Sequence, residues 1–356
     1  MKIIHVVGAR PNFMKVAPVM DALHAKTGVS QVLVHTGQHY DANMSEIFFN
    51  QLGIPEPDMN LGVGSGSHAQ QTAQIISSFE SVVLKQKPDL VLVYGDVNST
   101  VAAALVCSKL LVPVGHVEAG LRSFDRSMPE EINRLLTDQV ADILFTPSAD
   151  GNENLIKENI RPDKIHMVGN VMIDTLVRLI PQAVWPSEAL DFNADNSYAL
   201  VTLHRPSNVD DPESLISIIT TLEKVSADLA VIFPIHPRTR ARLTELGVKI
   251  RSNALQLVEP LGYLEFLALQ RDATLVITDS GGVQEETTFL NVPCLTVREN
   301  TERPITVEMG TNILVGQDMG KLMAAVNQVV VGRPKKGQTP PLWDGQVGKR
   351  IADILA

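Results

Sequence analysis

The sequence predicts an α/β fold made of two doubly wound, Rossmann-like domains, each built on a parallel sheet. Short β-branched runs alternate with segments of helical spacing almost from end to end, which is typical of βαβ units. The strands are apolar throughout rather than alternating, as expected where helices cover both faces of a sheet. The pattern also stops once and restarts, and 356 residues accommodate two domains better than one.

The N-terminal domain is predicted over residues 1–175. Its strands are expected in KIIHVVG, QVLVHTG, LVLVYGD, PVGHVEAG and ADILFTPS, with helices in VAPVMDALHAK and HAQQTAQIISSFESVVLKQ. Pro11 suits a first helical position. Pro18 is awkward for one uninterrupted helix, so we expect an irregular turn before the main helix begins.

The linker between the domains is predicted at residues 181–197, which contain Pro181 and Pro186 and show no clean periodicity. The C-terminal domain follows over residues 196–335, with strands expected in YALVTLHR, LAVIFPIHPR, LQLVEP, TLVITDSGG and PCLTVREN. A final helix within residues 344–356 is expected to pack back on the first domain. Two such domains leave a cleft facing their strand ends, a natural nucleotide site.

Composition excludes several classes of partner. A net charge of −10 argues against a nucleic acid or an anionic membrane, since both require a basic surface. No apolar run approaches the roughly 18 residues that cross a bilayer, and the N-terminus lacks a signal-peptide pattern, so we expect a cytoplasmic protein. Cys107 and Cys294 lie far apart in apolar sequence and are expected to be buried free thiols rather than a disulfide or a metal pair.

A dinucleotide fingerprint is missing. The first strand-turn, VVGARPNF, has a single glycine, and Gly62, Gly64 and Gly66 do not have the GxGxxG spacing. We therefore expect no bound NAD.

Two turns are predicted to bind anions. Arg10 follows the first strand where a helix opens, with Lys15 about one turn later; a surface Arg and Lys on an amphipathic helix is an equally supported alternative. In ATLVITDSGGVQEE, a buried strand leads through Ser280, Gly281 and Gly282 into a helix. The glycine pair lets backbone approach a ligand, so a diphosphate site is favoured over a simple capping turn.

Several cationic or proton-donating side chains follow other strands. His204 and Arg205 end the strand YALVTLHR, where such groups can neutralise a leaving phosphate, and for His204 we favour that role over a structural one. His236 lies near the end of LAVIFPIHPR, and a structural histidine is an equally open interpretation. Arg303, in ENTERPIT, either reaches the ligand or is an exposed loop charge.

Acidic side chains gather in one stretch of the N-terminal half. Asp96 follows a buried strand, but alone it reads as a cap for the helix at residues 98–100. Glu118 lies between a buried strand and a glycine, a position where no secondary-structure preference explains a glutamate. Glu130 begins a helix, where compensation of the helix dipole is the alternative, and its neighbour Glu131 points elsewhere. Together with the cations, these acids suit removal of a carbon-bound proton while a diphosphate departs.

The ordered motifs GARPNFMK, HTGQHYD, YGDVNST, HVEAGLRS, MPEEINR, LHRPSN, HPR, EPLGY, DSGGVQEE and TERP resemble those of the non-hydrolysing UDP-N-acetylglucosamine 2-epimerases. The resemblance runs from residue 3 to about residue 316. It implies a two-domain fold like that of the GT-B glycosyltransferases and a UDP-HexNAc substrate. It also implies a reaction without a redox cofactor, and we expect no bound metal.

The reaction implied by the resemblance interconverts UDP-GlcNAc and UDP-ManNAc, feeding surface polysaccharide synthesis. UDP leaves C1 while the C2 proton is removed, giving 2-acetamidoglucal, and UDP then adds back with the proton on the opposite face. The family pattern assigns the proton transfers to Asp96, Glu118 and Glu130. His204, Arg10 and the Ser280–Gly282 turn would lie at the diphosphate and Glu286 at the ribose, with Arg303 and Lys15 in the polar lining.

The sequence departs from the family at one place. Many bacterial members are activated by a second UDP-GlcNAc bound through GQH, a basic residue and then an amide or acidic residue, whereas this chain has Tyr40 and Asp41. HYDANMSEIFF and GSGSH are closer to archaeal members and to the branch acting on UDP-2,3-diacetamido-glucuronate. A 2-epimerase for such a modified sugar is the alternative within the class. A GT-B glycosyltransferase and a nucleotide-sugar binding protein are rivals from other classes, and we expect a homodimer.

Overall fold

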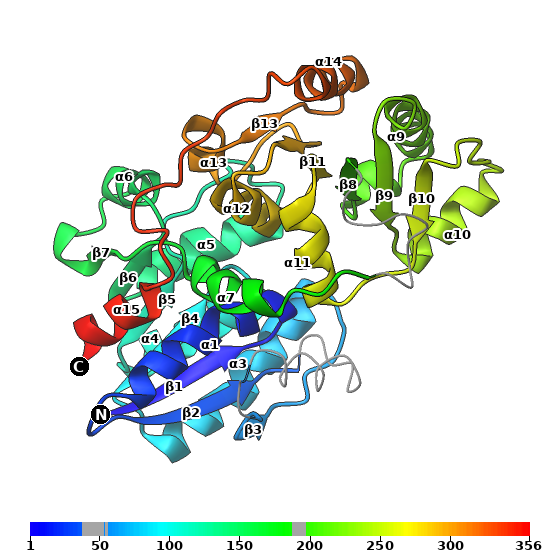
Figure 1. Cartoon of the computed structure of the whole chain (residues 1–356). Helices are drawn as coiled ribbons and strands as arrows, with labels where there is room; N and C mark the ends of the chain where they lie inside the picture. Colours follow the sequence, from blue (N-terminus) through cyan, green and yellow to red (C-terminus); the bar gives the residue numbers. More distant parts are fainter. Residues whose placement is uncertain (38–52, 54–55, 187–196) are drawn as a thin grey trace. The chain divides into compact units, whose positions relative to one another are not determined.

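The structure, a computed structural model, describes residues 1–37, 53, 56–186 and 197–356 (Figure 1). The chain divides into two compact units. Unit 1 comprises Met1–Leu176 and Pro341–Ala356, and unit 2 comprises Val177–Pro340. The departure from the family at Tyr40 and Asp41 lies outside the described residues, as does most of the expected linker.

Unit 1 is built on a seven-stranded parallel sheet in the order β3-β2-β1-β4-β5-β6-β7. The sheet grows in one direction from β1 to β3 and in the other from β4 to β7, so β1 and β4 meet at a topological switch point. Loops that follow these strands therefore lie where doubly wound sheets bind ligands. The strands are β1 (Lys2–Val7), β2 (Ser30–His35), β3 (Met59–Asn60), β4 (Leu90–Tyr94), β5 (Val114–Val117), β6 (Ile143–Thr146) and β7 (Ile165–Met167).

Helices connect these strands and bury the sheet. All residues of β4 are buried, which explains why its sequence is apolar without alternation. The helices of this part of the chain are α1 (Arg10–His24), α3 (His68–Gln86), α4 (Asn98–Leu110), α5 (Pro129–Val140), α6 (Ala149–Lys157), α7 (Val171–Leu179) and α15 (Val347–Leu355), with 3₁₀ turns at Pro162–Lys164 and Ile180–Gln182.

Unit 2 repeats the architecture with a six-stranded parallel sheet in the order β10-β9-β8-β11-β12-β13. Its switch point lies between β8 and β11. The strands are β8 (Tyr198–Thr202), β9 (Ala230–Pro234), β10 (Leu255–Val258), β11 (Leu275–Thr278), β12 (Cys294–Thr296) and β13 (Asn312–Leu314). The helices are α8 (Pro206–Val209), α9 (Pro212–Val225), α10 (Pro237–Glu245), α11 (Tyr263–Asp272), α12 (Gly281–Leu290), α13 (Pro304–Glu308) and α14 (Met319–Val330).

The expected irregular turn near Pro18 is wrong, because α1 runs through this residue without interruption. Proline has no N–H to donate to the carbonyl four residues earlier, which here belongs to Met14. The hydroxyl of Thr175, on α7, donates to that carbonyl at 2.5 Å instead. A contact between residues 161 positions apart thus satisfies the acceptor that the proline leaves open.

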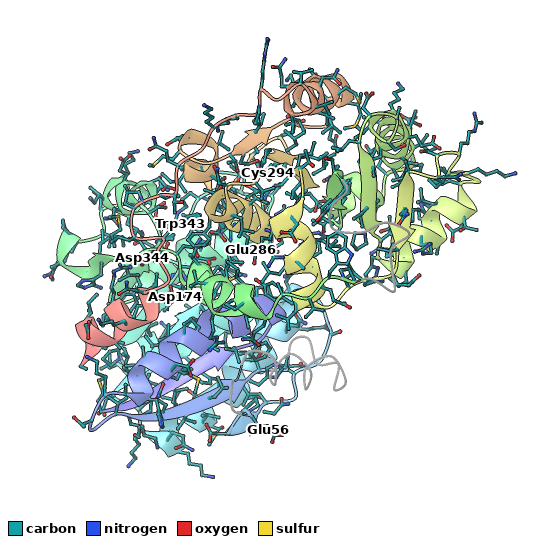
Figure 2. All side chains as sticks on the ribbon, in the orientation of Figure 1. Glu56, Asp174, Glu286, Cys294, Trp343 and Asp344 are labelled. Atoms are coloured by element: carbon teal, nitrogen blue, oxygen red, sulfur yellow. The ribbon has the colours of Figure 1, made fainter. Side chains whose placement is uncertain are left out.

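The C-terminal segment is part of unit 1, and its helix α15 lies beside α1 (Figure 1). The Asp174 carboxylate accepts hydrogen bonds from the N–H groups of Val347 and Gly348 and so caps the start of α15. Just before this helix, the Trp343 indole donates to the carbonyl of Pro147 at 3.0 Å (Figure 2). These bonds fix the segment to α7 and to the loop after β6.

Among the described residues, no helix is long and apolar enough to cross a membrane. Cys107 and Cys294 are both buried and free.

Docking of α15 on α1 requires a residue without a side chain at position 348. A Cβ on Gly348 would lie 2.7 Å from the carbonyl carbon of Pro18, which is backbone and cannot move aside. We expect Gly348→Ala to lower the free energy of unfolding by about 1–3 kcal/mol, measured by urea denaturation. Gly64→Ala is the control, because nothing lies within 4 Å of a Cβ there. Equal stability of the two variants would contradict this account of the contact.

Candidate active site

The acid-bearing turns of unit 1 follow β4 and β5, next to the switch point. Gly95 and Glu118 both have left-handed backbone, with φ of 64° and 75°. Glycine adopts this conformation readily, but a glutamate does so at a cost, and such strain concentrates at functional sites. The N–H of Glu118 donates to the carbonyl of Phe145 at 3.1 Å, which ties the strained residue to β6.

Glu118 forms a buried ion pair with Lys15. The Lys15 Nζ donates to Glu118 Oε1 at 2.7 Å, and both side chains are almost fully buried. Lys15 lies on α1 but is buried, so the alternative interpretation as a surface lysine is wrong. Arg10 is the first residue of the same helix, and its side chain lies outside what the structure describes. The structure thus brings a predicted acid and a predicted cation together across 103 residues of sequence.

Asp96 is held by a cation that the sequence analysis missed. The Arg134 guanidinium, on α5, donates to Asp96 Oδ2 from Nη2 at 2.7 Å and from Nε at 3.0 Å. The Asp96 side chain keeps 24% of its surface exposed, whereas Arg134 is buried. The N-cap of α4 is Val97, so Asp96 lies one residue before the cap.

The two glutamates at the start of α5 have different surroundings. Glu130 is half-buried, and no group in the described ranges forms a hydrogen bond or an ion pair with its carboxylate. Glu131 is buried and accepts hydrogen bonds from the Ser123 N–H and hydroxyl, from the Phe124 N–H and from Arg134. Glu131 therefore organises the loop before α5, while Glu130 remains available for chemistry.

A buried His–Asp pair connects both acid-bearing turns. His116, inside β5, contacts Asp138 Oδ1 through Nδ1 at 2.6 Å and the carbonyl of Gly95 through Nε2 at 2.9 Å. Burial opposes ionisation of Asp138, but the charges and hydrogen bonds of His116 and Arg122 hold its pKa below the ordinary value. A carbonyl and an ionised carboxylate only accept hydrogen bonds, so both ring nitrogens of His116 donate. Asp138 also accepts the N–H of Gly120, two residues after Glu118.

In unit 2 the predicted anion turn forms the N-terminus of α12. Ser280 is its N-cap residue, but the hydroxyl makes no capping hydrogen bond. The N–H groups of Gly281, Gly282 and Val283 have no acceptor within the helix, and the helix dipole adds partial positive charge there. Nothing lies within 4 Å of a Cβ built on Gly282, so a ligand atom can approach this backbone.

Asp279, which follows β11 and directly precedes this turn, holds both His204 and Arg205. His204 Nδ1 lies 3.0 Å from Asp279 Oδ1, and the N–H groups of both His204 and Arg205 donate to the same carboxylate. Burial opposes ionisation of Asp279, but the hydrogen bonds and the charge of His204 keep its pKa below the ordinary value. Nδ1 therefore donates to Asp279, and Nε2 of this largely exposed imidazole is left for a ligand.

Arg303 is buried, so the interpretation as an exposed loop charge is wrong. Its Nε lies 2.8 Å from Glu285 Oε1, and its Nη1 pairs with Glu302. A Cβ on Gly281 would lie 2.8 Å from Glu302 Oε1, so this ion-pair cluster packs directly against the anion turn. Whether Arg303 also contacts a ligand stays a prediction.

Glu286, on α12, is buried and accepts a hydrogen bond from the Tyr263 hydroxyl at 2.8 Å (Figure 2). Burial raises the pKa of Glu286 to about 7, despite that hydrogen bond.

His236 has a structural role, because it is the N-cap of α10 and its Nδ1 accepts the N–H of Arg238. Its exposed ring leaves the predicted ligand contact open.

Within the described parts of the chain, no group of three or more His, Cys, Asp or Glu side chains forms a metal-binding cluster. The chemistry available is that of carboxylates and their cations in unit 1 and of an anion-binding turn in unit 2. Carboxylates of this kind transfer protons, and orphan N–H groups with an imidazole bind phosphate oxygens.

Comparisons with known proteins agree with this set of chemical groups. Residues 21–356 match the UDP-N-acetylglucosamine 2-epimerase family. The UDP-N-acetylglucosamine 2-epimerase of Methanocaldococcus jannaschii is 47% identical, over 100% of this chain and 99% of its own length. The UDP-2,3-diacetamido-2,3-dideoxy-D-glucuronate 2-epimerase of Pseudomonas aeruginosa is 45% identical, over 100% and 99%.

Solved structures give the same result. A crystal structure of the M. jannaschii enzyme with UDP-GlcNAc and UDP aligns with a TM-score of 0.88 at 46% identity, covering 100% of this chain and 99% of the other. A galactosyltransferase of the lipopolysaccharide outer core aligns at a TM-score of 0.55 and 12% identity, which reports the shared GT-B-like fold alone. Its coverage of both chains is nearly complete. On the family match and the near-complete relatives, the chain belongs to the UDP-N-acetylglucosamine 2-epimerase family.

Proposed function

We propose that this protein is a non-hydrolysing 2-epimerase that interconverts UDP-GlcNAc and UDP-ManNAc. The observation that carries the proposal is the set of carboxylates at the carboxyl ends of β4 and β5 and at the start of α5, in a chain of this family. The reaction requires a base for the C2 proton on one sugar face and an acid for the return of a proton on the other. Asp96, Glu118 and Glu130 supply these groups.

The elimination step balances without a redox partner. A carboxylate takes the C2 proton, the electrons of the C–H bond form the C1–C2 double bond, and the C1–O bond breaks with its electron pair going to UDP. The intermediate is 2-acetamidoglucal. UDP then adds to C1 while a carboxylic acid delivers a proton to C2 from the opposite face, which inverts that centre.

The groups of unit 2 would stabilise the departing UDP. The orphan N–H groups of Gly281 and Gly282 suit the diphosphate oxygens, and so does the Nε2–H of His204 when its imidazole is protonated. Arg205 would add positive charge there and Ser280 an additional donor, while the assignment of Arg10 of unit 1 to the diphosphate stays a prediction. The Glu286 carboxylate would accept hydrogen bonds from the ribose hydroxyls, with Lys15, His236 and Arg303 completing the polar groups around the nucleotide sugar.

A second candidate substrate is favoured by a specific comparison. The P. aeruginosa relative named for UDP-2,3-diacetamido-2,3-dideoxy-D-glucuronate is almost as similar to this chain as the M. jannaschii enzyme, at 45% against 47% identity. A uronate carries an additional carboxylate, which would require a cation that UDP-GlcNAc does not. A homodimer in the cytoplasm and a role in polysaccharide synthesis stay predictions.

The function is tested by incubating the protein with UDP-GlcNAc in D₂O without added NAD and following the sugar by NMR. We expect UDP-ManNAc with deuterium at C2, because the removed proton exchanges with solvent on the enzyme. Free ManNAc with UDP would indicate a hydrolysing enzyme instead. Exchange with the diacetamido-uronate but not with UDP-GlcNAc would select the second substrate, and exchange with neither would overturn the proposal.

Glu118→Gln is the matched variant for this experiment. It keeps the size and a hydrogen-bonding oxygen near Lys15 but cannot take a proton, so the exchange rate should fall by about 100- to 10,000-fold. An exchange rate close to that of the unaltered protein would remove Glu118 from the mechanism.

A separate prediction concerns Glu286, whose pKa of about 7 lies above its ordinary value of 4.5. Because the folded chain holds this proton where the unfolded chain has lost it, the group's contribution to stability falls as the pH rises from about 4.5 to about 7. Glu286→Gln removes the buried charge, so at about pH 8.5 it should raise the free energy of unfolding by up to about 3 kcal/mol. The gain should shrink toward about pH 5.5, measured by urea denaturation.

The same variant should bind UDP about 10- to 100-fold more weakly, because an amide replaces a charged acceptor for the ribose. Glu213→Gln, at an exposed glutamate of the same unit, is the control and should change neither property. A stability gain without loss of UDP affinity would separate Glu286 from the ribose.

A further inference from the structure

The Arg134 side chain joins two carboxylates with different tasks. It is 2% exposed and lies on α5. Its Nε and Nη2 donate to Asp96 Oδ2, and its Nη1 donates to Glu131 Oε2. Its neighbour Asn133 donates from Nδ2 to the backbone carbonyl of Asp96 at 2.9 Å. Two successive residues of α5 thus hold both the side chain and the backbone of one proposed catalytic acid.

The guanidinium is fixed from its far side. Glu131 is 1% exposed, and besides Arg134 it accepts hydrogen bonds from Ser123 and from the Phe124 N–H. A carboxylate held by that many donors cannot rotate, so it fixes the plane of the guanidinium fork. The fork in turn presents Asp96 at a set position and favours its ionised form.

We propose that Arg134 is a positioning residue for Asp96, fixing the orientation and the charge of its carboxylate through the guanidinium fork that Glu131 holds. The proposal rests on the proposed function, in which Asp96 takes part in proton transfer. Arg134 is buried behind the carboxylate, and its role is exerted through Asp96 rather than on the substrate.

The two carboxylates depend on Arg134 to different degrees. Without the guanidinium, Glu131 keeps the three hydrogen bonds from Ser123 and Phe124. Asp96 loses both charge-assisted bonds from the guanidinium, and a quarter of its side chain is exposed. Loss of Arg134 should therefore act first on the reacting carboxylate and only second on the loop before α5.

Other charged and titratable groups face the same turn. A Cβ on Gly95 would lie 2.7 Å from Lys15 Nζ and 3.6 Å from Glu118 Oε1, and His116 donates to the Gly95 carbonyl. His68 contacts the side chain of Asn98, two residues after Asp96. The pH profile of the unaltered protein sums all of these groups, so the informative quantity is the difference between variants at position 134.

Arg134→Met and Arg134→Lys test the proposal. The methionine removes the charge, so kcat for C2 exchange should fall by about 100-fold and the acid limb of the kcat–pH profile should move to higher pH. The lysine keeps a charge but cannot serve both carboxylates as a fork, so kcat should fall while the acid limb stays closer to its original place. KM for UDP-GlcNAc should change little in both variants, because neither removes a substrate contact.

Four further variants separate positioning from a general structural role. Arg350→Met breaks an ion pair with Asp344 elsewhere in unit 1, and it should affect stability without moving the pH limb. In an Asp96→Asn background, Arg134→Met should add little further loss, because the two changes act on one group. If Arg134→Met does not fold, the test uses Arg134→Lys instead. The loss of kcat that it causes is then compared between the Asp96 and Asp96→Asn backgrounds.

The outcomes distinguish the two proposals. No C2 exchange by the unaltered protein, or exchange undiminished in Asp96→Asn, would remove the catalytic role of Asp96 and the inference with it. Exchange by the unaltered protein with kcat and the pH limb unchanged in the folded Arg134 variants would overturn the positioning role alone. Equal losses from Arg134→Met in the presence and absence of the Asp96 carboxylate would also overturn it.

Discussion

The proposed active site of unit 1 depends on one buried interaction, the pair formed by His116 and Asp138. The imidazole donates from one nitrogen to Asp138 and from the other to the carbonyl of Gly95, while Asp138 also holds the N–H of Gly120. Asp96 directly follows Gly95, and Glu118 lies two residues before Gly120. Because His116 lies in β5 and Asp138 in α5, a strand and a helix set the spacing of both turns.

The two units meet different electrostatic problems by the same means. In unit 1 the carboxylates needed for proton transfer are held by buried cations, Lys15 for one and Arg134 for another. In unit 2 a buried carboxylate, Asp279, orients a largely exposed imidazole beside a helix N-terminus. In each case a buried charged group fixes a polar side chain to which we assign a part in the reaction. Such preorganisation avoids reorientation when the substrate binds.

The elements and the turns were predictable because apolar runs and glycines mark them locally. The strand ends carrying Asp96, Glu118 and Ser280 follow from sequence pattern alone. The residues that hold these turns could not be predicted in the same way. Arg134 and Asp138 lie inside a helix, where sequence pattern indicates that a polar residue faces solvent. The failure at Pro18 has the same origin, since the donor that satisfies its helix comes from another helix. Local pattern reports the chain's conformation, and long-range pairing decides which side chains meet.

The central claim is that proton transfer depends on turns held from within unit 1. Its most direct test is the rate of C2 exchange by His116→Gln at saturating UDP-GlcNAc, followed by NMR in D₂O. Glutamine cannot donate to both Asp138 and Gly95 with the imidazole's geometry, so the turns lose their common support. The account predicts a loss of about 100-fold in a protein that remains folded. A rate within about twofold of the unaltered protein would contradict it, since that is far less than misplacing a catalytic group costs.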